Sequence, residues 1–170
     1  MRTVLAVVAM AACGGCGYHV AGHTDLMPES IRTICVPAFS NLTVRYRLTD
    51  HLPEAIAREF ISRTRYRIVA DPEQADAVLK GGIINYLSYP TVFDPATGRA
   101  STVQFQVRMN ITLTERATGK VLYSAPNFTA SNQYEISTTP RDYFEESDTA
   151  LDRMSQEVAR TVVSAILEHF

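Results

Sequence analysis

The alternation of apolar and polar residues is clearest between Ser101 and Glu115, in the segment STVQFQVRMNITLTE. Apolar side chains fill every second position, at Val103, Phe105, Val107, Met109, Ile111 and Leu113. The positions between them are Gln104, Gln106, Arg108, Asn110, Thr112 and Thr114. A period of two predicts a strand with one buried and one solvated face. The solvated face is either ordinary exposed sheet or, if all helices pack on the other side, a surface open to a partner.

Further strands are predicted on both sides of this segment. They cover Ile31–Asn41, Tyr66–Val69, Ala77–Tyr89 and the segment VLYSAPNFTASNQYEIS that begins at Val121. Polar turns are predicted at Asp94–Ala100 and at Arg116–Lys120, where Gly119 is able to take a positive φ. Gly81-Gly82 indicates a bulge or a close backbone approach, and Pro126 indicates a bulge or an edge strand.

Two helices are predicted from apolar positions with helical spacing. The first begins at a cap on Thr49 or Asp50, has Pro53 in its first turn and ends near Thr64. Its stripe is Leu48, Leu52, Ile56 and Phe60. The second begins at Pro140, with Thr139 as cap and Asp142 completing a capping box, and runs to the C-terminus. Its stripe is Leu151, Met154, Val158, Val162, Ala165 and Ile166.

The order strand, helix, several strands, helix predicts an α+β two-layer sandwich with the helices on one face of the sheet. The chain has 170 residues, of which 46% are hydrophobic, and this suits one domain with one core. The formal net charge is −2 and no stretch is strongly basic, so we expect no nucleic-acid partner. Lys80 and Lys120 are the two lysines among the 16 basic residues.

The N-terminus predicts export. Arg2 precedes an apolar run from Val4 to Ala12, which is shorter than the roughly 20 residues that a membrane-spanning helix needs. Such a run is typical of a secretory signal peptide. We find no later segment that is long and apolar enough to span a membrane, so we expect an exported protein without a transmembrane helix.

Two cysteines follow the apolar run. MAAC places the acylated cysteine of a bacterial lipobox at Cys13, and CGGC places it at Cys16 with an unusual cysteine at the apolar position. On the residues alone Cys13 fits slightly better. A redox pair, a zinc site and a disulfide are weaker alternatives, because the pair lies outside a folded βα unit and lacks further ligands with metal spacing. Cys35, in the apolar run TICVPAF, is expected to be a buried, inert thiol.

The sequence shows no set of catalytic residues, no metal-binding spacing and no phosphate-binding loop. KGG at Lys80–Gly82 lies inside a strand pattern, so a structural role is favoured over phosphate binding. Glu145, Glu146 and Asp148 lie near the start of the last helix, where acidic residues suit the helix dipole.

The segment CGYHVAG, Cys16–Gly22, resembles the mature N-terminus of the lipopolysaccharide-assembly lipoprotein family LptE. TICVPAFSN resembles the first core strand of that family, and ADAVLKGGIINY resembles the start of its strand pair. The resemblance shifts the expected lipidated residue to Cys16, with Cys13 as the alternative. It implies a signal peptide at residues 1–15 and one LptE-like domain at residues 16–170.

The resemblance implies two helices against a four-stranded mixed sheet. It also implies a non-enzymatic plug inside the LptD β-barrel, which assists barrel assembly and lipopolysaccharide delivery to the outer leaflet. The expected partners are that barrel, lipopolysaccharide and the membrane, and no cofactor is expected besides the covalent N-terminal lipid. Gly17, or Gly14, follows the anchor in place of aspartate, which permits sorting to the periplasmic side of the outer membrane.

Family members are thought to contact lipopolysaccharide through basic residues at the loop end of the sheet. The positions here that correspond are Arg99, in the turn Asp94–Ala100, and Arg141 in a neighbouring connection. Arginine pairs with phosphate through two N–H donors, although two solvated surface arginines explain the pattern equally well.

The competing hypothesis is a lipoprotein regulator of a periplasmic cell-wall enzyme. Such regulators usually carry a long disordered linker between the lipid and the domain. Here the first predicted strand begins only about 15 residues after Cys16, which at ~3.3 Å per residue is too short to cross a wall layer. The short linker favours the barrel plug.

Overall fold

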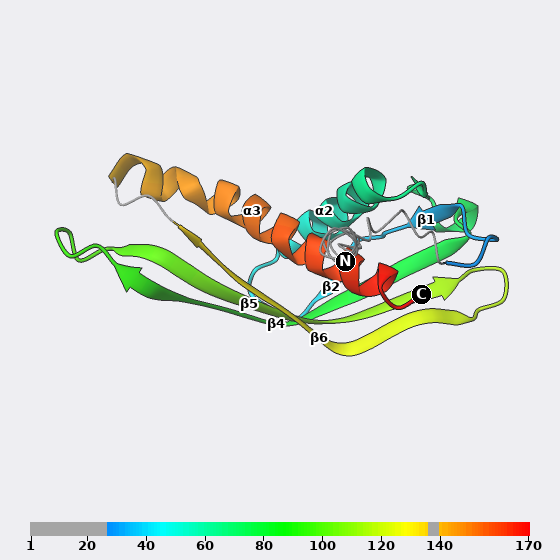
Figure 1. Ribbon diagram of the computed structural model, residues 1–170. Coiled ribbons are helices and arrows are strands. Elements are labelled where there is room, and N and C mark those ends of the chain that lie inside the picture. The colour runs from blue at the N-terminus through cyan, green and yellow to red at the C-terminus, as the bar shows by residue number, and fades with distance from the viewer. Residues whose placement is uncertain (1–26, 136–139) are drawn as a thin grey trace, which may run out of the picture.

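The computed structural model describes residues 27–135 and 140–170, and it gives the backbone alone at residue 134 and residues 140–149. In the described part, two long helices lie on one face of a sheet whose central strands extend well beyond them (Figure 1). The α+β two-layer architecture predicted from the sequence is confirmed. Both layers meet in a single large apolar cluster that contains residues of the sheet and of both helices.

The sheet is mixed and has six strands, in the order β3-β1-β4-β5-β6, with β2 paired to β4 beside that path. The strands are β1 Thr33–Cys35, β2 Ser40–Asn41, β3 Arg67–Ile68, β4 Ala77–Phe93, β5 Ala100–Glu115 and β6 Val121–Glu135. The three short strands pair in parallel, whereas β4, β5 and β6 form a long antiparallel meander.

The expected number of four strands was too low. The predicted strand Ile31–Asn41 is divided into β1 and β2, because the chain leaves the sheet between them at Pro37, which has no N–H to offer a neighbouring strand. The strand predicted at Tyr66–Val69 is confirmed as the short β3, which lies at the outer side of β1 and is a further strand beyond the four. The meander is longer than predicted, since β4 continues to Phe93.

Helix α2, Leu48–Arg63, buries the whole predicted stripe. Its predicted start was wrong, because the N-cap is Arg47, with no side-chain cap. Pro53 therefore lies in the second turn and cannot donate to the Thr49 carbonyl. That carbonyl accepts instead from the Phe39 N–H, at 3.1 Å, which ties the entrance of β2 to the helix.

Helix α3, Pro140–Leu167, packs beside α2 and covers β6. Four residues of its predicted stripe are buried: Met154, Val158, Val162 and Ile166. Leu151 and Ala165 are partly exposed. His51 Nδ1 lies 2.9 Å from Asp152 Oδ1 and joins the two helices. The predicted caps at Thr139 and Asp142 involve groups outside the described part of the chain.

Asp76 fastens β1 to the start of β4. Its Oδ2 atom accepts hydrogen bonds from the Arg32 N–H, the Thr33 N–H and the Thr33 hydroxyl, each at 2.9 Å. These bonds, the one from the Arg32 backbone above all, hold the pKa of Asp76 below its ordinary value. The carboxylate charge therefore stabilises this junction.

The long strands turn where the sequence predicts. Gly98 and Gly119 have φ angles of 66° and 70°, which glycine adopts without steric cost. β6 is the edge strand, and its register moves from Ile111↔Ala125 to Met109↔Phe128, which leaves an extra residue on β6. The bulge and the edge position predicted from Pro126 are both confirmed.

Candidate functional site

The helix-free face is the side of the sheet opposite α2 and α3, and it carries the outward side chains of β4, β5 and β6 (Figure 1). On β5 the exposed side chains alternate with Phe105, Val107, Met109, Ile111 and Leu113, all of which are at most 1% exposed. The predicted division of this strand into two faces is confirmed from Phe105 to Leu113, whereas Val103, predicted on the buried face, is only partly buried. Neighbouring strands add polar residues in register, because Thr112 pairs with Ser124, Arg108 with Thr129 and Gln106 with Ser131.

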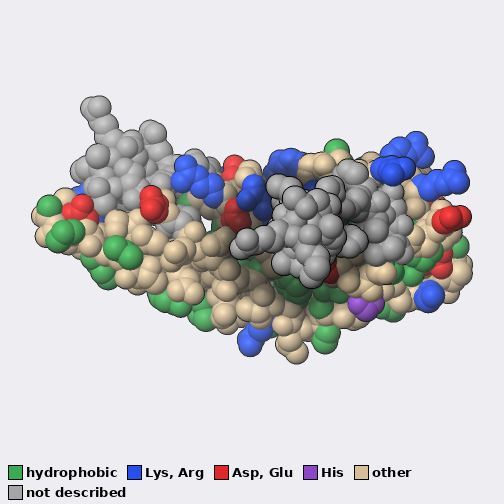
Figure 2. Space-filling view, in the orientation of Figure 1, with side chains coloured by type: hydrophobic (Ala, Val, Ile, Leu, Met, Phe, Trp, Pro, Cys, Tyr) green, Lys and Arg blue, Asp and Glu red, His purple; other side chains and the backbone are tan. Residues whose placement is uncertain are grey.

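Charged side chains gather mainly over the helices, and the sheet side of the molecule in Figure 2 is mostly neutral. Along the middle of the helix-free face the charged groups are Lys80 on β4 and Arg108 on β5. Neither has an ion pair or a side-chain hydrogen bond among the residues that the structure describes. The middle of this face is therefore polar and weakly positive.

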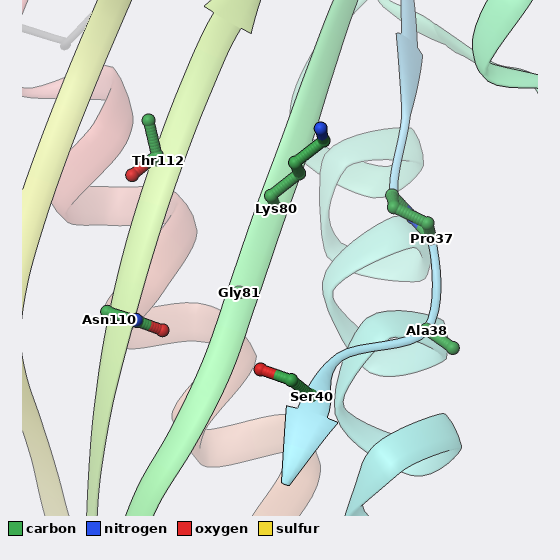
Figure 3. Close-up of a pocket in the computed structure, with 7 residues that line it drawn as sticks. All are labelled: Pro37, Ala38, Ser40, Lys80, Gly81, Asn110 and Thr112. Carbon is green, nitrogen blue, oxygen red and sulfur yellow. The ribbon is translucent and has the colours of Figure 1, made fainter.

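A cavity of about 410 Å³ opens on this face, between the β1–β2 connection and strands β4 and β5. Its polar side chains are those of Ser40, Lys80, Asn110 and Thr112. Ser40 and Asn110 point toward one another across β4 in Figure 3. The ladder explains this arrangement, since Ser40 and Asn110 both pair with Gly82, and Lys80 pairs with Thr112.

Two adjacent glycines shape the two sides of the sheet at this point. A Cβ atom at Gly81 would overlap the ring of Phe39, which is buried under β4. A Cβ atom at Gly82 would overlap Asn110 Oδ1 and Ser40 Oγ on the opposite side. The close backbone approach predicted for Gly81-Gly82 is confirmed, and the register shift follows between Ile83 and Asn85.

An apolar strip lies at the edge of the same sheet. Leu42, Val44 and Tyr46, between β2 and α2, are 81%, 94% and 77% exposed. The Leu42 N–H donates to the Ile83 carbonyl at 3.0 Å, which places this segment against β4. Beyond that point β4 has no partner on this side among the described residues, and Leu87, Tyr89, Val92 and Phe93 are exposed along it. The strip therefore offers apolar side chains beside unpaired strand backbone.

The tip of the β4–β5 hairpin carries Arg99. Asp94 Oδ1 accepts from the N–H groups of Ala96 and Thr97, and these bonds, led by that from Thr97, lower the pKa of Asp94. The Arg99 carbonyl accepts from the Asp94 N–H at 2.8 Å, which closes the turn. Arg99 thus lies on an ordered turn at the far end of the sheet.

Several predicted site residues lie outside the described part of the chain. Cys13 and Cys16 precede residue 27, and the side chain of Arg141 belongs to the segment given as backbone alone. Cys35 is buried as predicted, and burial raises the pKa of its thiol, which keeps it protonated and unreactive.

Among residues 27–135 and 140–170, no group of three or more His, Cys, Asp and Glu side chains has the geometry to hold a metal ion. No helix within the same ranges combines the length and the apolar character that crossing a membrane requires.

The cavity was missed by the sequence analysis. Gly81 and Gly82 have the close packing that KGG indicated, and Lys80 lines a hollow that Ser40, Asn110 and Thr112 share. These residues belong to three segments far apart in the sequence, and only the strand register brings them together. The available signal was the row of polar residues at the outward positions of β5. It identified Asn110 and Thr112 as exposed residues, but it did not predict the cavity between β5, β4 and the β1–β2 connection.

Solved structures with this fold come from several bacteria. The PelC dodecamer of Paraburkholderia phytofirmans has 16% identity, and the match covers 81% of this chain and 89% of that one with a TM-score of 0.52. A protein of Xanthomonas campestris has 14% identity over 81% of this chain and 83% of that one, with a TM-score of 0.54. A hypothetical protein of Chlamydia trachomatis has 12% identity over 81% and 95%, with a TM-score of 0.51. At these identities the likeness shows a shared fold.

The family comparison is more specific. No curated protein matches the sequence. The model of the family LptE, described as lipopolysaccharide-assembly, matches residues 31–166, a span that includes every strand and most of α3. The resemblance noted in the sequence is thereby confirmed. The chain belongs to the LptE family of lipopolysaccharide-assembly proteins.

Proposed function

We propose that this protein is an outer-membrane lipoprotein that plugs an LptD-type β-barrel and assists both the assembly of that barrel and the delivery of lipopolysaccharide to the outer leaflet. The observation that carries the proposal is the family match over residues 31–166. The shape and chemistry of the sheet add support, because a plug must present a large surface that suits the inside of a barrel.

The helix-free face has the polarity that such a position requires. The interior of a membrane β-barrel is polar, because its strands alternate apolar side chains that face lipid with polar side chains that face the lumen. Amides, hydroxyls and the cations Lys80 and Arg108 occupy most of the middle of the helix-free face, so these groups could form hydrogen bonds with such a wall.

The apolar strip at the sheet edge supplies a second kind of contact. Exposed apolar groups that lie together and are rimmed by polar residues mark protein interfaces. Arg45 lies over the Tyr86 ring, with its Cζ atom 5.6 Å from the ring centroid, and gives the strip such a polar rim. The unpaired backbone of β4 beyond Ile83 offers hydrogen bonds to a strand or loop of the barrel.

The membrane attachment in this proposal is the acylated thiol of Cys16, with Cys13 as the alternative. Several acyl chains on one residue hold a protein firmly, whereas a single chain gives only marginal binding. Mass spectrometry of the mature N-terminus distinguishes the two cysteines. A mature chain without acylation at either one contradicts the attachment.

Contact with lipopolysaccharide is assigned to Arg99 and Arg141. For Arg99 we expect that Arg99→Glu weakens lipopolysaccharide binding by the purified chain, because the substitution replaces a phosphate-binding cation by an anion. Arg58→Glu is the matched control, since Arg58 is an exposed arginine on α2, away from the hairpin. Unchanged binding by Arg99→Glu removes that residue from the site.

The decisive test of the proposed function is purification of the chain from membranes in a gentle detergent. We expect a large β-barrel to copurify, and we expect Val44→Glu to reduce the yield of that complex by placing a charge in the apolar strip. Val121→Glu is the matched control, because Val121 is also an exposed valine but begins β6, away from this strip. Recovery of a cell-wall synthase or hydrolase without a barrel would favour the competing role as an enzyme regulator.

A further inference from the structure

Four side chains that can form hydrogen bonds line the cavity on the helix-free face, and none of them bonds to another group in the described part of the fold. The side chains of Ser40, Lys80, Asn110 and Thr112 line it, and none of them has a hydrogen bond or an ion pair among the described residues. Polar groups of a folded protein normally find protein partners or water. Four such groups around one hollow therefore form a set that is free to bind a ligand.

The backbone makes room for this set. Gly81 lines the cavity, and the next residue, Gly82, lies between its register partners Ser40 and Asn110, so that a side chain there would overlap both of theirs. Behind Gly81, the buried ring of Phe39 supports the strand from the helix side. Core packing thus fixes the β4 side of the hollow, and the β1–β2 connection forms its other side.

The chemistry of the lining fits one class of ligand. Among the described residues that line the cavity, Lys80 is the single charged one, and none of them carries a carboxylate. The hydroxyls of Ser40 and Thr112 and the amide of Asn110 both donate and accept, which suits the hydroxyl groups of a sugar. Pro37 and Ala38 of the β1–β2 connection add apolar groups to the lining, which suits the C–H groups of a sugar ring.

We propose that this cavity binds an anionic saccharide, a sugar ring that carries a phosphate or a carboxylate, with the anionic group on the Lys80 ammonium. A pocket of about 410 Å³ lies within the range of small-molecule sites and accommodates one or two rings. The site is distinct from Arg99, which lies at the hairpin tip.

The test uses the full chain in detergent with four probes: glucose 6-phosphate, glucuronate, glucose and inorganic phosphate. The two lysines of the sequence allow an internal control, because amine acetylation followed by mass spectrometry reports on Lys80 and Lys120 in the same sample. We expect both anionic sugars to slow acetylation at Lys80 and leave Lys120 unchanged. Equal effects on both lysines, or no effect, would overturn the proposal.

Calorimetry on variants tests the assignment of each group. We expect Lys80→Gln to weaken the affinity for glucose 6-phosphate by about tenfold, the typical effect of one charge-assisted hydrogen bond, and Lys120→Gln to leave it unchanged. Asn110→Asp places a carboxylate in the cavity and is expected to abolish binding, whereas Gln106→Glu adds the same charge to β5 outside the lining and is expected to have little effect. Wild-type affinity in Lys80→Gln contradicts the site.

The remaining probes define the ligand class and its source. Glucose and inorganic phosphate are each expected to bind much more weakly than glucose 6-phosphate. Inorganic phosphate that binds as tightly as the sugar phosphate would overturn the saccharide assignment. A phosphorylated glycolipid in the same detergent that binds more tightly than glucose 6-phosphate identifies a membrane source, and equal affinities identify a soluble sugar. Copurification of the barrel is a separate measurement, so failure here does not bear on it.

Discussion

The two faces of β5 differ at every step along the strand. Phe105 is 1% exposed and packs into the apolar cluster under the helices, whereas the next residue, Gln106, points away from them and is exposed. The same alternation continues to Leu113. One face therefore provides the burial that stabilises the fold, and the other face is free to carry polar groups that the fold does not need.

This separation explains how a binding surface is placed on a stable scaffold. Residues of the helix-free face contribute little apolar burial, so the packing of the core constrains their identities less. Residues of the covered face are set by the volume between the sheet and helices α2 and α3. Substitutions of adjacent residues that lie on opposite faces should therefore change stability on the covered face and binding on the helix-free face.

The largest expected effect comes from Phe105→Ala. Removing this buried ring leaves a cavity between the sheet and the helices, so we expect the free energy of unfolding to fall by about 3–5 kcal/mol. Gln106→Ala, one residue away, is expected to change it by less than about 0.5 kcal/mol. Urea denaturation of both variants measures the difference, and similar losses would show that the two faces are not energetically distinct.

The adjacent glycines test the same contrast at the backbone. Gly81→Ala directs a methyl group into the buried Phe39 ring, so we expect a loss of about 2 kcal/mol in the free energy of unfolding, as for other overpacked cores. Gly82→Ala meets the ends of the exposed Ser40 and Asn110 side chains, which are free to move toward solvent, and is expected to cost less. An equal cost for the two variants would mean that the helix-free face is as rigid as the core.

The smallest expected effect on stability concerns Asp76, which joins β1 to the start of β4. Asp76→Asn keeps one oxygen acceptor but removes the charge, so we expect a loss of roughly 1 kcal/mol at neutral pH. The pKa of Asp76 is depressed in the folded chain, so its contribution is complete above the unfolded value of ~3.9 and is lost as the pH falls through the folded pKa. Thermal unfolding of wild type and variant should therefore converge in acid.

Periodicity predicted the elements whose residues interact along one segment. The stripe Leu48, Leu52, Ile56 and Phe60 and the alternation of β5 both follow from local geometry, and both are buried as expected. Turn glycines were equally local, because a positive φ at Gly98 or Gly119 is a property of a single residue.

The features that the sequence did not predict depend on distant pairings. The start of α2 was misplaced because the Thr49 carbonyl, which Pro53 cannot use, is satisfied by the Phe39 N–H from another segment. The cavity likewise requires the register of β2 and β5 on β4, which no local pattern specifies. Prediction of the site thus needs the sheet topology first.

The pairing of α2 with α3 has a consequence for how the chain reaches its native state. His51 and Asp152, which meet across the helices, are 101 residues apart in the sequence. Strands β4, β5 and β6 are consecutive in the sequence and pair soon after they are synthesised. The apolar face that α3 covers stays exposed to water until this last helix docks. A polypeptide truncated before residue 140 would therefore expose the apolar face of the sheet. We expect envelope proteases and chaperones to act on such fragments in preference to the full-length chain.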